Sequence, residues 1–212
     1  MRLAWQVRTE VFHLTGEPGE SGFGRKVVGR RPPCAHAAIL SRILCRMTEQ
    51  TSLLAPSDRL LFDISHIDMD KVMADTAFVE RTNPQQGDMR QLDHVIWWNE
   101  ESTAAIGVKQ IGSDEFWVPG HIPGRPLYPG VLQIEAAAQL ASFVHRNRWQ
   151  DDAFLGFTRV KNWSFRGQIV PGDTLVMLTN EVKSNQRRFV CDLQGFVNQK
   201  MVFDGSITGM KL

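Results

Sequence analysis

The chain has 212 residues, of which 42% are hydrophobic and 22% charged, and its formal net charge at pH 7 is +1. This composition is that of an ordinary folded protein, and the near-zero charge gives no general attraction to nucleic acid. No apolar run approaches the roughly 20 residues that a bilayer-spanning helix needs. The cysteines, Cys34, Cys45 and Cys191, are widely spaced and lack zinc-ligand spacing. The sequence therefore predicts a cytoplasmic protein without a disulfide framework or a bound metal.

The first 56 residues form an irregular stretch that is rich in Gly, Pro and charge. Residues 1–46 hold eight Lys or Arg against three Glu. Such a stretch buries too little apolar surface to fold, so we expect a basic, disordered arm over residues 1–56 and a folded domain over residues 57–212. Two alternatives stay open: a short amphipathic helix over HAAILSRILCRM, and a translation start at Met47.

The first part of the expected domain contains a short helix and a hairpin. Asp75 can cap a helix over residues 76–83, which Pro84 ends because proline disfavours helical backbone in the residue before it. Residues 90–98 and 103–111 are strand-like runs joined by the polar NEES, a pattern typical of an antiparallel hairpin.

A long apolar helix is expected over residues 130–147. Its stretch from Val131 to Val144 is apolar almost all round, which indicates a helix covered by other structure rather than one lying on a surface. Four strand-like runs follow, separated by short polar turns. We therefore expect an α+β fold in which about six antiparallel strands wrap one buried helix. The four runs cover residues 153–165, 173–182, 187–197 and 200–210.

The loop before this helix is stiff and contains one histidine. Seven of the twelve residues from Pro119 to Gly130 are Gly or Pro, and the prolines restrict the backbone on both sides of His121. A histidine held in a fixed direction suits a general base, because its ring takes up or releases a proton near neutral pH.

The helix itself offers an acid and a pair of backbone donors. Glu135 stands alone among apolar residues, where a carboxyl group spends time protonated, and Gln139 lies one turn further on the same face. The N–H groups of Gly130 and Val131 at the helix N-terminus can hold a developing oxyanion. Together with His121, these groups suit elimination of water from a 3-hydroxyacyl thioester.

These residues also form a recognisable motif. GHIPGRPLYPGVLQIEAAAQ resembles the signature GHFPxxPxxPGVxxxEAxAQ of the FabZ-type 3-hydroxyacyl-[acyl carrier protein] dehydratases, with the same separation of fourteen between His121 and Glu135. The resemblance extends from about Asn83 to the C-terminus, and FRGQIVPGD is similar to the family's F-x-x-P-V-x-P-G-D turn. In the related FabA-type isomerising enzymes an Asp holds the acid position, so Glu135 favours the non-isomerising kind.

The resemblance implies a hotdog fold, in which an antiparallel sheet wraps a long central helix, and a role in fatty acid biosynthesis. It implies a homodimer, with hexamers of three dimers common in the family, whose sites combine His121 of one subunit with Glu135 of the other. His121 would then be the catalytic base and Glu135 the acid, with Gly130 supplying a backbone donor to the thioester carbonyl and Gln139 supporting Glu135. No cofactor is implied.

Three features depart from the family pattern, one of them being the arm before about residue 57, which has no family counterpart. Ile122 replaces the usual Phe beside the histidine, and QQGDMRQLDH stands where the family often has HRYPFLLVDR, which keeps Asp93 but no aromatic tunnel gate. The acyl carrier protein is acidic, so a basic surface should receive it, and Arg159 and Lys161 alternate onto one face of a predicted strand. The alternatives are a hotdog acyl thioesterase and a non-catalytic acyl-binding protein.

Overall fold

The computed structural model describes residues 60–150 and 153–212. The arm expected over residues 1–56, the expected start of the domain at residue 57, the possible helix over HAAILSRILCRM and Met47 lie outside the described residues. Within the described ranges, no helix is both long and apolar enough to cross a membrane.

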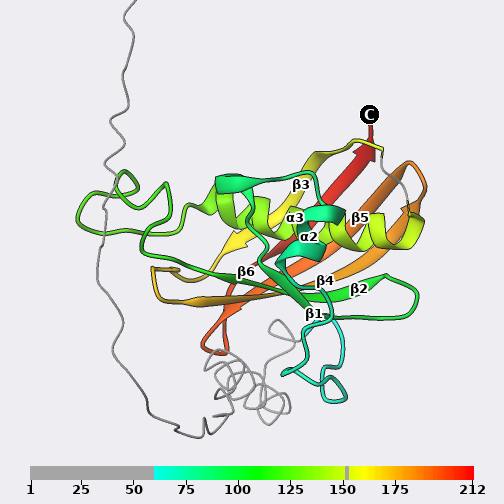
Figure 1. The fold of residues 1–212 in the computed structure, drawn as a ribbon, viewed down its shortest axis with the longest axis horizontal. Coiled ribbons are helices and arrows are strands. Elements are labelled where there is room, and N and C mark those ends of the chain that lie inside the picture. The colour runs from blue at the N-terminus through cyan, green and yellow to red at the C-terminus, as the bar shows by residue number, and fades with distance from the viewer. Residues whose placement is uncertain (1–59, 151–152) are drawn as a thin grey trace, which may run out of the picture. The chain divides into compact units, whose positions relative to one another are not determined.

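Six strands form one antiparallel sheet (Figure 1), as the strand-like runs and the short polar turns between them predicted. The expected hairpin is confirmed by the pairing of Val95 with Gly107. The strand that follows the long helix lies at one edge of the sheet, beside the last strand of the chain. The strands, in the spatial order β1-β2-β4-β5-β6-β3, are β1 (His94–Trp98), β2 (Ala104–Gln110), β4 (Thr174–Asn185), β5 (Arg188–Val197), β6 (Lys200–Lys211) and β3 (Leu155–Phe165).

The long helix α3 (Gly130–Trp149) crosses one face of this sheet (Figure 1). Its small side chains let it approach the strands closely, and Ala136, Ala137 and Ala141 are fully buried. On the sheet side, a Cβ at Gly107 would lie 2.8 Å from Leu140 Cδ1, so glycine leaves the space that the helix fills. The wrapped helix and antiparallel sheet confirm the expected α+β hotdog fold.

A short helix, α2 (Thr76–Thr82), precedes the sheet as predicted. The side chain of Asp75 caps it by accepting the Phe78 N–H at 2.8 Å. Asn83 ends the helix with an extended backbone (φ −99°, ψ 144°), the conformation that the following Pro84 favours. A 3-10 turn, η3 (Gly87–Met89), then leads into β1.

A second hydrophobic cluster covers the sheet face that points away from α3. The irregular segment 60–73 supplies four of its ten buried side chains, although nothing in its sequence pattern indicated burial. Four side chains of the segment, Leu60, Ile64, Ile67 and Met69, cluster with the strand residues Ile106, Val108, Val176, Leu178 and Phe196. The sheet therefore has a core on both faces, and segment 60–73 belongs to the folded unit.

Candidate active site

The loop that contains His121 is closed by its own hydrogen bonds. Trp117 accepts the His121 N–H at 2.8 Å, and the His121 carbonyl accepts the Leu127 N–H at 3.0 Å. Between them lies a tight turn in which the Arg125 N–H donates to the Ile122 carbonyl at 2.8 Å. Gly124 provides the positive φ (75°) that the third position of this turn requires.

The imidazole of His121 has one of its two nitrogens fixed. Nδ1 lies 2.8 Å from the Leu127 carbonyl oxygen. Because a carbonyl only accepts, Nδ1 carries the hydrogen, and Nε2 of the neutral ring is left to take a proton. The side chain is exposed within one chain. The loop that contains His121 therefore also sets the tautomer of its ring.

The base of this loop is anchored to the sheet by buried charges. Lys109 on β2 binds Glu115 at 2.6 Å, with only 7% and 12% of the two side chains exposed, and its Nζ lies 3.8 Å from an oxygen of Asp93. Two residues after Glu115, the buried ring of Trp117 packs against Tyr128 with centroids 5.6 Å apart. Sequence reasoning missed the pair Lys109–Glu115, since a single charge in a strand and another in a loop give no local signal.

Glu135 and Gln139 meet as the helical spacing predicted. Gln139 Nε2 donates to Glu135 Oε1 at 2.8 Å. Glu135 is half-buried, whereas Gln139 is fully buried. The carboxyl group therefore has one oxygen held by a neutral donor and the second available to a ligand.

The N-terminus of α3 presents the expected backbone donors. The Pro129 carbonyl accepts from Leu132 and Gln133 at 2.9 and 3.0 Å. The N–H groups of Gly130 and Val131 have no acceptor among residues 60–150 and 153–212. A Cβ at Gly130 would lie 2.8 Å from Phe165 Cζ, so glycine leaves room for this aromatic ring beside the free donors.

Four of the predicted residues, Gly130, Val131, Glu135 and Gln139, lie in the N-terminal half of α3. His121 lies in the loop that leads into this helix, yet no hydrogen bond joins it to Glu135, and its ring bonds only to its own loop. A single described chain therefore carries both groups without an interaction between them.

Tyr128 and Gln91 are two further buried polar residues behind Glu135. The Tyr128 hydroxyl donates to Gln91 Oε1 at 2.8 Å and lies 3.0 Å from the Leu132 carbonyl. Burial, reinforced by the negative charges of Glu115, Asp93 and Glu135, raises the pKa of Tyr128 far above its ordinary value, so its hydroxyl stays a neutral donor. No local pattern indicated this pair, because its members are 37 positions apart in the chain.

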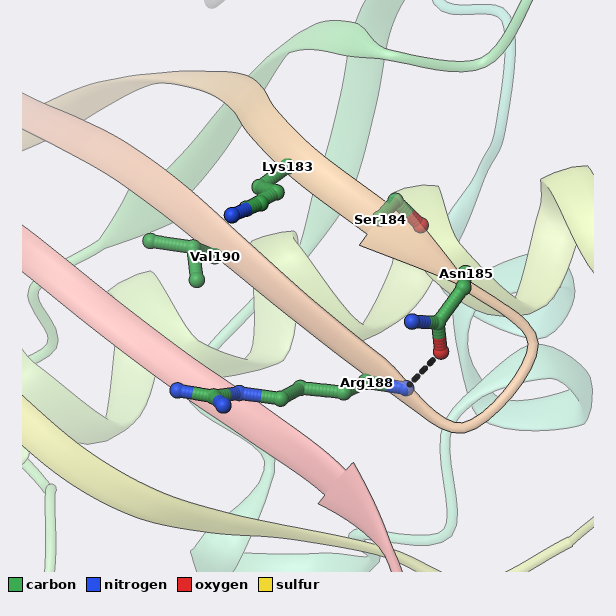
Figure 2. Close-up of a pocket in the computed structure, with 5 residues that line it drawn as sticks. All are labelled: Lys183, Ser184, Asn185, Arg188 and Val190. Carbon is green, nitrogen blue, oxygen red and sulfur yellow. Dashed lines mark hydrogen bonds between the residues drawn. The ribbon is translucent and has the colours of Figure 1, made fainter.

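Among the described residues, no group of three or more His, Cys, Asp or Glu side chains is placed to hold a metal ion. A pocket of about 280 Å³ lies at the β4–β5 hairpin and contains none of the predicted site residues. Figure 2 shows its lining, in which Asn185 accepts the Arg188 N–H at 3.0 Å and the cationic side chains point away from the hairpin turn. The pocket is lined by Lys183, Ser184, Asn185, Arg188 and Val190.

A family model and several relatives of known name point to the same protein family. A family model described as a FabA-like domain matches residues 83–206. The 3-hydroxyacyl-[acyl-carrier-protein] dehydratase FabZ of Streptococcus pneumoniae is 31% identical over 140 residues, covering 64% of this chain and 96% of the relative. The bifunctional enzyme LpxC/FabZ of Porphyromonas gingivalis is 39% identical over 103 residues, covering 45% of this chain. The chain spans only 21% of that bifunctional protein and 53% of the FabZ dehydratase of Acetivibrio thermocellus.

Among solved structures, the dehydratase heterocomplex ApeI:P from Xenorhabdus doucetiae has the same fold. The match has a TM-score of 0.55 at 16% identity and covers 63% of this chain and 90% of the compared chain. At this identity the likeness concerns the fold alone.

Proposed function

The chain belongs to the FabA-like family, together with the FabZ dehydratases, and from this premise we propose that it is a 3-hydroxyacyl-[acyl carrier protein] dehydratase of fatty acid biosynthesis. The proposal is supported by a base in the loop before α3 and an acid on α3, in a helix whose N-terminus carries free backbone donors. His121 has Nε2 available because Nδ1 donates to Leu127, and Glu135 has one oxygen bound by Gln139 and one open.

The proposed reaction is an elimination with balanced proton transfers. Nε2 of His121 removes a proton from C2 of the 3-hydroxyacyl thioester, and Glu135 protonates the hydroxyl group on C3, which leaves as water. The N–H groups of Gly130 and Val131 stabilise the charge that develops on the thioester oxygen. A proton then passes from the imidazolium to the carboxylate, and the product is the trans-2-enoyl thioester.

The site is proposed to be completed by a second copy of the chain. The large apolar side chains next to Gly130 are exposed, Val131 at 74% and Phe165 at 53%, as expected for surfaces that a partner covers. The long strand β3 is also an edge of the sheet, and its unpaired backbone groups can pair with another strand. A homodimer would bring His121 of one subunit to Glu135 of the other, and hexamers of such dimers remain part of the proposal.

A basic surface on the sheet is proposed to receive the acidic carrier protein. Register pairs place Lys183, Val190, Thr208 and Arg159 in one row across four strands. This row points away from α3, because the neighbours of Val190 along β5 pack against the helix residue Ala141.

Arg188 and Lys161 continue this surface in the adjacent rows, on β5 and β3. None of the four cations on this surface has a carboxylate partner among the described residues. Figure 2 shows two of these cations, Lys183 and Arg188, at the rim of the hairpin pocket. Charge reversal of Arg159 and Lys161 should raise KM for the carrier-bound substrate and leave KM for a short thioester unchanged. An unchanged KM for the carrier-bound substrate would contradict docking here.

The activity is tested by following the absorbance of an enoyl thioester with purified protein. The proposal predicts hydration of the enoyl thioester to the 3-hydroxyacyl thioester, and loss of this activity in His121→Ala and Glu135→Gln. Release of free thiol would indicate a thioesterase instead. Unchanged absorbance with the unaltered chain would indicate a non-catalytic acyl-binding protein.

A further inference from the structure

Both N–H groups of the Gln139 side-chain amide and its oxygen have hydrogen-bond partners. Its Nε2 donates to Glu135 Oε1 at 2.8 Å and to the Met89 carbonyl at 2.7 Å, and its Oε1 accepts the Gln91 N–H at 2.8 Å. A flipped amide would place Oε1 against two acceptors and Nε2 against a donor. The orientation of Gln139 is therefore set by the backbone of residues 89–91, and through it the donor to Glu135 is fixed.

That backbone segment is held in turn by the side chain of Gln91. Gln91 Nε2 donates to the Asp88 carbonyl at 2.7 Å, and Gln91 Oε1 accepts the Tyr128 hydroxyl at 2.8 Å. Both side chains are buried, so neither group exchanges its partner for water.

Tyr128 connects this segment to the end of α3. Its N–H donates to the Ile169 carbonyl at 2.8 Å, and its carbonyl accepts from Gln133 at 3.1 Å. The chain of contacts thus runs from Tyr128 through Gln91 and Gln139 to Glu135. It passes through QQGDMRQLDH, the segment in which this chain departs from the family pattern.

We propose that Tyr128 and Gln91 are positioning residues for the acid Glu135, acting through Gln139. By fixing the donor on Oε1, they leave Oε2 as the oxygen that holds the proton delivered to the departing hydroxyl. The inference rests on the proposed function for its catalytic meaning, while the orientation of Gln139 is a separate, measurable property.

Two single variants and their combination separate positioning from stability. Tyr128→Phe leaves Gln91 Oε1 buried without a partner, so both Tm and kcat should fall, kcat by about tenfold to a hundredfold with KM little changed. Gln91→Leu should also lower kcat, although the Tyr128 hydroxyl keeps the Leu132 carbonyl.

The double variant Tyr128→Phe/Gln91→Leu removes both members of the Tyr128–Gln91 bond, so Tm should recover in part while kcat stays low. The recovery of Tm is partial because the Asp88 carbonyl still lacks the donor that Gln91 provides. Recovery of kcat together with Tm would show that the pair only stabilises the fold, and would overturn the proposal. So would unchanged kcat in all three variants. Trp149→Phe serves as the matched control: it removes a hydrogen bond to Ser184 at the opposite end of α3, and kcat should be unaffected.

Hydrogen exchange of the Gln139 side-chain amide, followed by NMR, gives a readout independent of activity. Slow exchange in the unaltered chain and faster exchange in Tyr128→Phe are expected. Equal exchange in both would overturn the proposal even in an active enzyme. A chain without dehydratase activity would instead contradict the proposed function, and the amide exchange would still decide whether Tyr128 fixes Gln139.

Discussion

Substitution of Ile64 tests whether segment 60–73 is part of the folded domain. Ile64 is only 1% exposed and belongs to the cluster on the sheet face opposite α3. Replacing a buried Ile with Ala costs about 2–5 kcal/mol, and the lower half of that range applies where the surroundings can collapse into the cavity. A segment without regular structure can shift in this way, so we expect Ile64→Ala to lose about 2–3 kcal/mol.

For a domain of this size, each kcal/mol of lost stability lowers Tm by about 2–4 °C, so the expected fall in Tm is about 4–12 °C. Val72→Ala is the matched control within the same part of the chain, because Val72 is 49% exposed and its truncation should change stability by less than about 0.5 kcal/mol. Thermal and urea unfolding followed by circular dichroism measure both variants. Equal stability of Ile64→Ala and Val72→Ala would refute the packing of this segment on the sheet.

Three further predictions concern buried groups elsewhere in the sheet. Burial lowers the pKa of His94, although the charge of Asp93 opposes the shift, so the unfolded chain binds a proton at higher pH than the folded chain. The free energy of unfolding should therefore fall as the pH drops below about 6.5. Urea midpoints measured over this pH range should fall less in His94→Gln. Burial raises the pKa of the Cys191 thiol, so peptide mass spectrometry should find Cys191 alkylated only after unfolding, and rapid alkylation of the native protein would contradict its burial. A Cβ at Gly209 would lie 2.1 Å from Phe189 Cζ, so Gly209→Ala should destabilise by about 2–3 kcal/mol, whereas Gly120→Ala, with open space around it, should not.

The sequence predicted those parts of the fold that depend on local pattern. Asp75 and Pro84 mark the two ends of α2, and the strands have clear alternation with short polar turns between them. The His121 and Glu135 motif was equally visible, because its spacing is contained in a single stretch of chain.

Other features depend on contacts between distant parts of the chain. The bond between Tyr128 and Gln91 and the ion pair of Lys109 with Glu115 arise only when the sheet register is formed. The burial of Ile64 was hidden for a related reason, since an irregular segment has no periodicity to indicate the face it covers. These contacts follow from tertiary packing, which local propensity does not encode.

Mixing two inactive variants tests the central claim that His121 and Glu135 form one dehydratase site across a dimer. Each of His121→Ala and Glu135→Gln should lack activity alone. Random exchange of subunits makes about half of the dimers mixed, each with one intact site, so about a quarter of the wild-type activity should return. Mixed dimers verified by native mass spectrometry that show no activity would contradict the account, and so would full activity of either variant by itself.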